Sequence, residues 1–132
     1  MREYRFRGWD AVGNKGWVYG DLVHNQKVTM TGLEPRIMVG GYEVVPESVG
    51  ISVGITDRDG VMLYEGDIVD IEPDVANMYK IESRGYIYYS SASFYFGKTA
   101  YRATVEFICS CCGVFRGRVI GNVFENRDLL DN

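Results

Sequence analysis

Three cysteines lie close together near the C-terminal end of the sequence, at Cys109, Cys111 and Cys112, and the single histidine, His24, lies far from them. These residue types can bind zinc, and a cysteine can also act as a nucleophile. Structural zinc sites commonly combine two pairs of closely spaced ligands, and this sequence has no second pair. We therefore expect reduced cysteines in a turn, with no metal site and no cofactor.

A run of carboxylates in the middle of the sequence could bind a divalent cation. Its members are Asp57, Asp59, Glu65, Asp67, Asp70, Glu72 and Asp74. An EF-hand loop aligned on Gly60 would place Gly66 where a bidentate glutamate is needed, so this interpretation fails. Asp74 and Glu82 could serve a metal-dependent nuclease, but Arg84 stands where that site needs a lysine. The nuclease is a distant alternative, and we expect turns, a solvated face and no catalytic residue.

Basic and aromatic side chains in the last third of the sequence could bind single-stranded nucleic acid. Aromatic rings stack on bases while arginine and lysine contact phosphates, and small β-barrels often carry such sites. The candidate residues are Lys98, Arg102, Arg116, Arg118, Tyr88 and Phe94. The net charge of −4 argues against a dedicated duplex-DNA binder but allows a local basic patch.

The Tyr-rich segment 74–101 holds more aromatic surface than one small barrel easily buries. Exposed aromatic patches often mark protein interfaces, so this segment predicts a homo-oligomer. The sequence contains no Gly-rich phosphate loop, Ser-His-Asp set or H-E-x-x-H motif. We therefore expect a protein that is not an enzyme and that acts through protein contacts or self-assembly. Binding of single-stranded nucleic acid is the alternative.

Composition and length favour a small all-β protein. The chain has 132 residues and is 46% hydrophobic, with Gly 16, Tyr 10 and only Pro 3, which is typical of many turns and aromatic strands. We expect an N-terminal antiparallel β subdomain over residues 1–46 and a small SH3-like β-barrel over residues 47–132, unless both form a single compact unit. The Tyr-rich segment would be an insertion in the barrel. Helix is expected only as one or two turns within residues 75–82 and as a terminal turn within residues 123–132.

The strand pattern is clearest over residues 45–72. Residues 49–55 alternate apolar side chains with glycine or serine, and residues 57–60 supply turn chemistry before a returning strand. Further towards the N-terminus, the pattern predicts a strand at 17–23, a break at 24–26, a short strand at 27–31 and a turn at 32–35.

The N-terminal residues lack the apolar core of a secretory signal, and no apolar run reaches membrane-spanning length. The cysteine usage fits a reducing compartment. We therefore expect a cytoplasmic protein without a membrane partner.

Three pieces of the chain, in this order, resemble the YopX-type proteins encoded by phages and prophages of Gram-positive bacteria. The first, residues 6–21, contains RGWD and ends in YGD. The second, residues 45–69, contains VPESVG, GITDRDG and YEGDIV, and the third, residues 119–130, contains VIGNVFEN. The resemblance implies an all-β fold with a strand-rich N-terminal part and a small barrel, and it implies no activity. It also implies a bacterial host cell, with phage or host proteins as partners.

Overall fold

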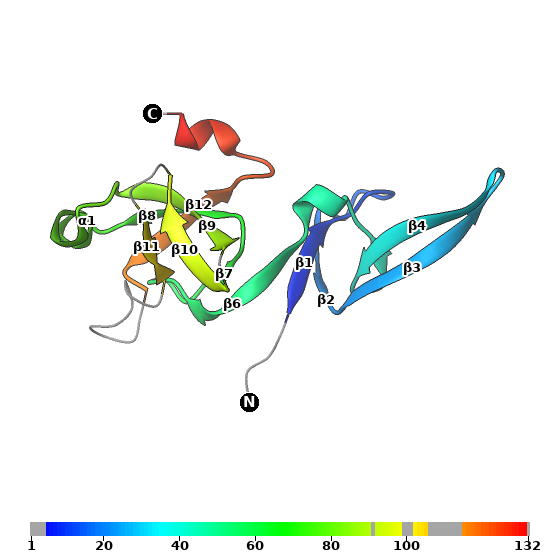
Figure 1. Ribbon diagram of the computed structural model, residues 1–132, viewed down its shortest axis with the longest axis horizontal. Coiled ribbons are helices and arrows are strands. Elements are labelled where there is room, and N and C mark those ends of the chain that lie inside the picture. The colour runs from blue at the N-terminus through cyan, green and yellow to red at the C-terminus, as the bar shows by residue number, and fades with distance from the viewer. Residues whose placement is uncertain (1–4, 91, 99–101, 106–114, 132) are drawn as a thin grey trace. The chain divides into compact units, whose positions relative to one another are not determined.

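The computed structural model describes residues 5–90, 92–98, 102–105 and 115–131, which form mainly antiparallel strands (Figure 1). In chain order the elements are β1 (Phe6–Trp9), β2 (Trp17–Gly20), β3 (Leu22–Thr29), β4 (Gly32–Val39), β5 (Tyr42–Glu43), η1 (Pro46–Ser48), β6 (Gly50–Thr56), β7 (Met62–Tyr64), β8 (Asp67–Ile71), α1 (Pro73–Tyr79), β9 (Arg84–Ser90), β10 (Ser93–Gly97), β11 (Arg102–Thr104), β12 (Gly117–Asn122) and η2 (Arg127–Leu130). The prediction of an all-β fold with little helix is confirmed.

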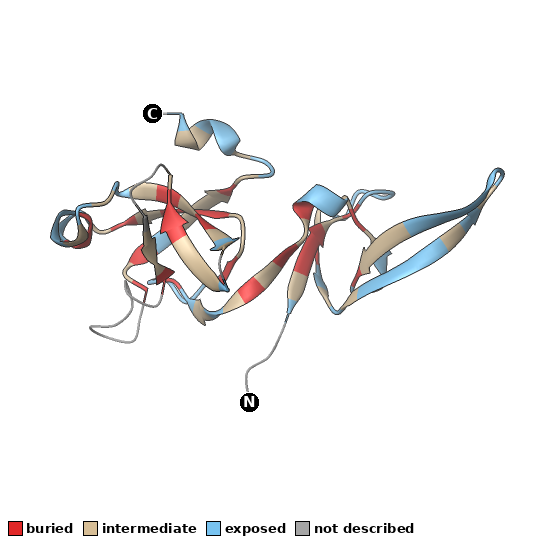
Figure 2. Ribbon diagram, viewed as in Figure 1, coloured by how far each residue is buried: buried red, intermediate tan, exposed pale blue. Residues whose placement is uncertain are grey.

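The contacts within the chain form two compact units, residues 1–52 and 53–132. The sequence predicts a boundary six residues earlier, after residue 46. Strand β6 begins in the first unit and continues into the second. Buried residues concentrate separately in each unit (Figure 2).

Strand β1 is the central strand of the first unit. It pairs antiparallel with β2 along its whole length and with the first residues of β6. The core of this unit consists of Val18, Val39 and Val44. Gly8 of β1 lies directly against Val44, because a Cβ at Gly8 would stand 2.8 Å from the Val44 side chain. The absence of a side chain at Gly8 therefore lets β1 approach the core.

Strands β3 and β4 form a long antiparallel hairpin that extends away from β1 and β2 (Figure 1). The pairing is continuous from Leu22 opposite Val39 to Thr29 opposite Gly32. The predicted break at residues 24–26 is therefore wrong. Polar residues are tolerated there because residues 24–26 of β3 are themselves exposed.

The predicted turn at residues 32–35 is also wrong, because these residues belong to β4 and the hairpin turns at Met30 and Thr31. Pro35 is tolerated within the strand because β5 pairs only with Met38 and Val39. Strand β4 therefore has an open edge at Pro35, where a missing N–H removes no bond to a further strand.

The second unit contains a five-stranded antiparallel sheet in the order β11-β10-β9-β8-β12, while β7 is hydrogen-bonded to β6. Its core consists of Leu63, Val69, Ile71, Val75, Ala76, Ile87, Phe96, Val105 and Phe115. Strands β9 and β10 of the Tyr-rich segment supply Ile87 and Phe96 to this core, so the segment forms the middle of the sheet. Over the described residues the sheet orders are open, and the expected SH3-like barrel is not confirmed.

Helix α1 begins at Pro73, where a proline loses no helical hydrogen bond, and ends before Lys80, which adopts a left-handed conformation with φ of 55°. The Lys80 N–H donates to the carbonyls of Ala76 and Asn77, which closes the last turn. In the described part of the chain, no helix has the length and apolar character needed to cross a membrane.

Candidate interaction surfaces

Asp57, the first residue of the carboxylate run in the middle of the sequence, is nearly fully buried and stabilises a turn. Its carboxylate accepts hydrogen bonds from the backbone N–H groups of Asp59 at 2.8 Å, Val61 at 2.9 Å and Val119 at 3.0 Å. The last bond joins the turn to β12. Asp67 is likewise buried, and its carboxylate accepts a bond from the backbone N–H of Tyr64 at 2.8 Å. Both carboxylates therefore have structural roles.

Asp10 plays the same part in the first unit. Its carboxylate accepts hydrogen bonds from the backbone N–H groups of Val12, Gly13 and Lys15. The bonds from Gly13 and Val12 hold the pKa of Asp10 below its ordinary value of 3.8. A charged Asp10 thus fixes the loop between β1 and β2.

Arg116 joins two of the carboxylates that the sequence offers for metal binding. Its guanidinium donates to Glu72 at 3.1 and 3.2 Å and to Asp74 at 2.9 Å. The hydrogen bond from Arg116 is the main cause that lowers the pKa of Glu72. For Asp74, burial raises the pKa, but the hydrogen bond and charge of Arg116 outweigh it and the pKa is lowered. Arg116 is therefore committed to acidic partners within the unit.

Other charges around β8 and β12 are also matched. Arg118 pairs with Asp59 at 2.8 Å, and Arg84 pairs with Asp70 at 2.7 Å. Asp70 and Arg118 line a shallow groove of about 300 Å³. Arg58 and Glu72 also line this groove and form an ion pair at 3.1 Å, and such matched charges are typical of a solvated ion-pair surface.

The residues considered as metal ligands in the sequence are only partly described. Cys109, Cys111 and Cys112 lie outside the described residues, and His24 is exposed on β3. Asp74 is held by Arg116, while Glu82 is exposed after α1. Among the residues that the structure describes, no three His, Cys, Asp or Glu side chains lie close enough together to hold a metal ion.

The aromatic residues predicted for nucleic-acid binding divide between the two faces of the β9–β10 hairpin. Phe94 is opposite Tyr89, and Tyr88 is opposite Tyr95. Because neighbouring residues of a strand point to opposite faces, Tyr88 and Phe94 cannot contribute to one surface. Phe94 packs against the core of the second unit.

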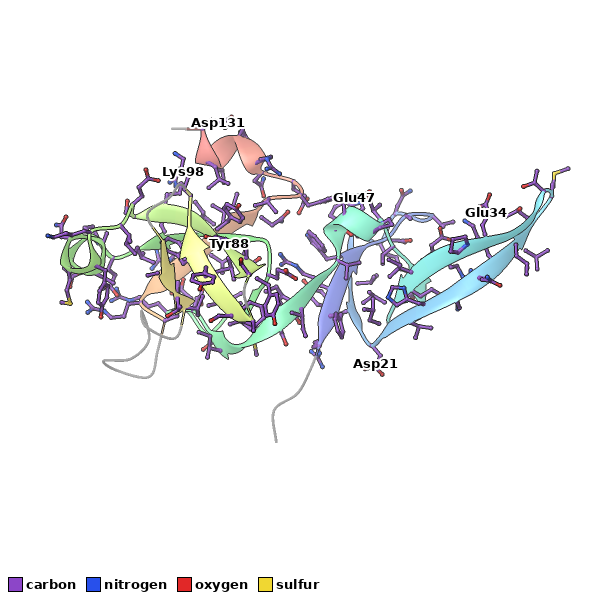
Figure 3. All side chains as sticks on the ribbon, viewed as in Figure 1. Asp21, Glu34, Glu47, Tyr88, Lys98 and Asp131 are labelled. Carbon is purple, nitrogen blue, oxygen red and sulfur yellow. The ribbon has the colours of Figure 1, made fainter. Side chains whose placement is uncertain are left out.

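The basic candidates are more dispersed. Lys98 directly follows β10 (Figure 3), and Arg102 begins β11, although its side chain lies outside the described part of the structure. Arg116 and Arg118 are paired with carboxylates at the other side of the sheet, on and beside β12. The described residues therefore bring together no continuous basic patch from this set.

Three tyrosines do share one face. Tyr86 and Tyr88 alternate along β9, and Tyr95 lies opposite Tyr88 on β10. The ring centroids of Tyr86 and Tyr88 are 5.1 Å apart, and those of Tyr88 and Tyr95 are 5.8 Å apart with nearly parallel planes. All three rings are half-buried and form a small aromatic surface, which we call the tyrosine face.

The β3–β4 hairpin has one apolar face, which we call the hairpin apolar face. Cross-strand partners point to the same side of a ribbon, and this side carries four pairs. From base to tip they are Leu22 with Val39, His24 with Ile37, Gln26 with Pro35 and Val28 with Leu33. The base of this face packs into the core of the first unit. Its distal end is exposed, since Val28 and Leu33 keep 84% and 64% of their surface accessible and Met30 at the turn is fully exposed.

Beyond its base, the other face of the hairpin is polar and internally bonded. Arg36 donates to the side chain of Asn25 at 2.7 Å, and Lys27 pairs with Glu43 of β5 at 3.0 Å. Glu34, opposite Lys27, is also on this side (Figure 3). The hairpin is thus amphipathic over its distal part, whereas Val23 and Met38 make this second face apolar near the base.

Sequence reasoning missed this surface because it placed a break and a turn within the hairpin. The available signal was the return of apolar residues across a two-residue turn, with Val28 and Leu33 as partners. Met30 and Thr31 are unusual residues for such a turn. The prediction therefore placed the turn at residues 32–35, which contain glycine and proline.

Both the sequence and the fold match known proteins. The family model described as YopX protein matches residues 5–131. The crystal structure of protein EF1440 from Enterococcus faecalis is similar, with a TM-score of 0.56 and 23% sequence identity over 98% of this chain and 99% of that chain. At this level of identity the likeness shows a shared fold. No curated protein matches the chain.

Proposed function

The chain belongs to the YopX protein family, and we propose that it is a phage- or prophage-encoded protein that is not an enzyme and that binds another protein through the hairpin apolar face. Its place of action is the cytoplasm of the bacterial host. The exposed distal end of this face, formed by Val28, Met30 and Leu33, is the observation that carries the proposal.

The physical reason is the cost of exposed apolar surface. Each Å² of apolar surface removed from water contributes roughly 25 cal/mol to stability. Val28 and Leu33 contribute little of this to folding, because most of their surface stays exposed. A two-stranded ribbon is marginally stable by itself. An amphipathic ribbon that continues beyond the core it starts from is therefore explained by a partner that covers it.

The charged groups of the second unit support a role without catalysis. Catalytic acids and bases usually have pKa values shifted towards neutrality. Here the pKa values of Glu72 and Asp74 are lowered and the pKa of Arg84 is raised, so each of these groups is held in its charged form. Such shifts are typical of ion pairs that stabilise a surface.

Site-specific photo-crosslinking in host cells tests the proposal. A benzophenone amino acid at Leu33 is expected to give a discrete protein adduct. The matched control is Glu34, which is exposed at the next position and on the opposite face of the hairpin. No adduct at Leu33, or the same adducts at both positions, would show that the hairpin apolar face is not the binding surface.

The tyrosine face supports a second candidate function, the binding of single-stranded nucleic acid. Bases stack on aromatic rings with roughly 1–3 kcal/mol per base. Fluorescence anisotropy with labelled single-stranded oligonucleotides at low salt is expected to show binding that Tyr88→Ala weakens. Tyr89, which is exposed on the other face of the β9–β10 hairpin, is the control position. An unchanged anisotropy signal would remove this candidate.

A further inference from the structure

We propose that the protein bound by the hairpin is a second copy of this chain. Two hairpins would pack face to face through Val28, Leu33 and Pro35, with Met30 closing the end of the contact. This inference rests on the function proposed above and names its partner.

The charge pattern of the hairpin favours a second copy. None of the eight residues that form the hairpin apolar face is Asp, Glu, Lys or Arg. Packing this face against itself therefore buries no ionised carboxylate, ammonium or guanidinium and brings no like charges together. A strongly charged partner would find no complementary group on it. The polar face differs, because Lys27, Arg36 and Glu34 would meet their own copies there.

The geometry of the hairpin also suits a two-fold contact. In such a contact the same patch serves both copies, so it must be complementary to itself. Val28 and Leu33 lie opposite each other in the ribbon and are similar in size and polarity, so the distal patch offers a uniform apolar surface. Met30 has an unbranched, flexible side chain that adapts to a neighbouring surface.

We place the contact on this face rather than on the open edge of β3. Val28 and Leu33, the two most exposed apolar side chains of these strands, share this face, and pairing at the strand edge would not cover them. The accessible apolar residues would thus be covered by face-to-face packing and left exposed by edge pairing.

The small area of the distal patch limits the affinity that we expect for the dimer. A standard stable interface buries about 800 Å² on each partner, and the distal part of one hairpin offers less. We therefore expect a reversible dimer with a dissociation constant in the micromolar range.

Sedimentation velocity of the purified full chain, from roughly 1 to 300 µM, tests the inference. The wild-type chain is expected to shift from monomer to dimer across this range. Leu33→Lys and Leu33→Glu, which add opposite charges, are both expected to weaken the dimer at least tenfold. Glu34→Lys, on the opposite face, is expected to retain it. Circular dichroism confirms that each variant is folded.

A wild-type monomer at the highest concentration, or a dimer unaffected by both Leu33 variants, would overturn the inference. Its failure can be told apart from that of the proposed function. If the purified chain is monomeric and the Leu33 crosslinker captures a different protein in cells, the hairpin binds a partner that is not a second copy. If Leu33 gives no adduct, both proposals fall.

Discussion

Replacement of Asp57 by alanine should destabilise the second unit more than any change to its exposed neighbours. The substitution removes one buried carboxylate and leaves three backbone N–H groups, those of Asp59, Val61 and Val119, without their acceptor. A hydrogen bond to a charged group contributes about 1.5–3 kcal/mol, but water can reach the two amides in the exposed turn. We expect a loss of about 3 kcal/mol. For a chain of this length that corresponds to a decrease in Tm of about 12 °C.

Urea unfolding followed by far-UV circular dichroism measures this loss. Asp59→Ala is the matched control, because the Asp59 side chain is 47% exposed and makes an ion pair with the exposed Arg118. Such a pair contributes less than about 1 kcal/mol. Asp57→Asn should be intermediate, since its amide retains one acceptor but turns an N–H group towards Val119. If Asp57→Ala and Asp59→Ala differed by less than about 1 kcal/mol, the structural role assigned to Asp57 would be refuted.

Three further predictions concern stability. Gly8→Ala should cost about 1–3 kcal/mol in chemical denaturation, because its Cβ would stand 2.8 Å from the Val44 side chain; an unchanged midpoint would contradict this. Gly66→Val should cost about 1–3 kcal/mol, because Gly66 has a φ of 95°. Asp70→Asn, in a half-exposed ion pair with Arg84, should cost less than about 1 kcal/mol; the reverse order in thermal melts would argue for a functional Asp70. The folded-state pKa of Glu72 is lowered below 4.5, so its contribution to stability is present above that pH and is lost as the pH falls through the folded pKa. Melts from pH 6 to 2 should therefore show a smaller acid loss for Glu72→Gln than for the wild type.

The sequence predicts the parts of this fold that local turn chemistry specifies. Strand β6 and the turn after it are both present, and the turn depends on the Asp57 carboxylate. The motif GNVFEN is explained in a similar way. The side-chain oxygen of Asn122 accepts the N–H groups of Phe124 and Glu125, while Asn126 accepts the N–H of Asn122. The residues that carry the family resemblance thus specify turns.

The distal part of the hairpin could not be predicted because its exposed side chains leave no buried-face pattern in the sequence. A polar run such as residues 24–26 indicates a break in a strand when one face of that strand must be buried. This part of β3 is exposed, so the strand continues through the polar run. The residues predicted to bind nucleic acid do not lie on one surface, and the reason for this is different. Alternation places Tyr88 and Phe94 on opposite faces, but that follows only once the register between β9 and β10 is known.

The position of the hairpin in the chain has a consequence during synthesis. All strand pairings of β3 and β4 lie within residues 22–43, whereas the second unit needs β12 to pair with β8. At ~5–20 residues per second, a ribosome needs roughly 4 to 14 s to extend the chain from residue 52 to residue 122. During this interval we expect the hairpin to be formed on the nascent chain. Two chains on one messenger RNA could then meet through their hairpins before either is complete.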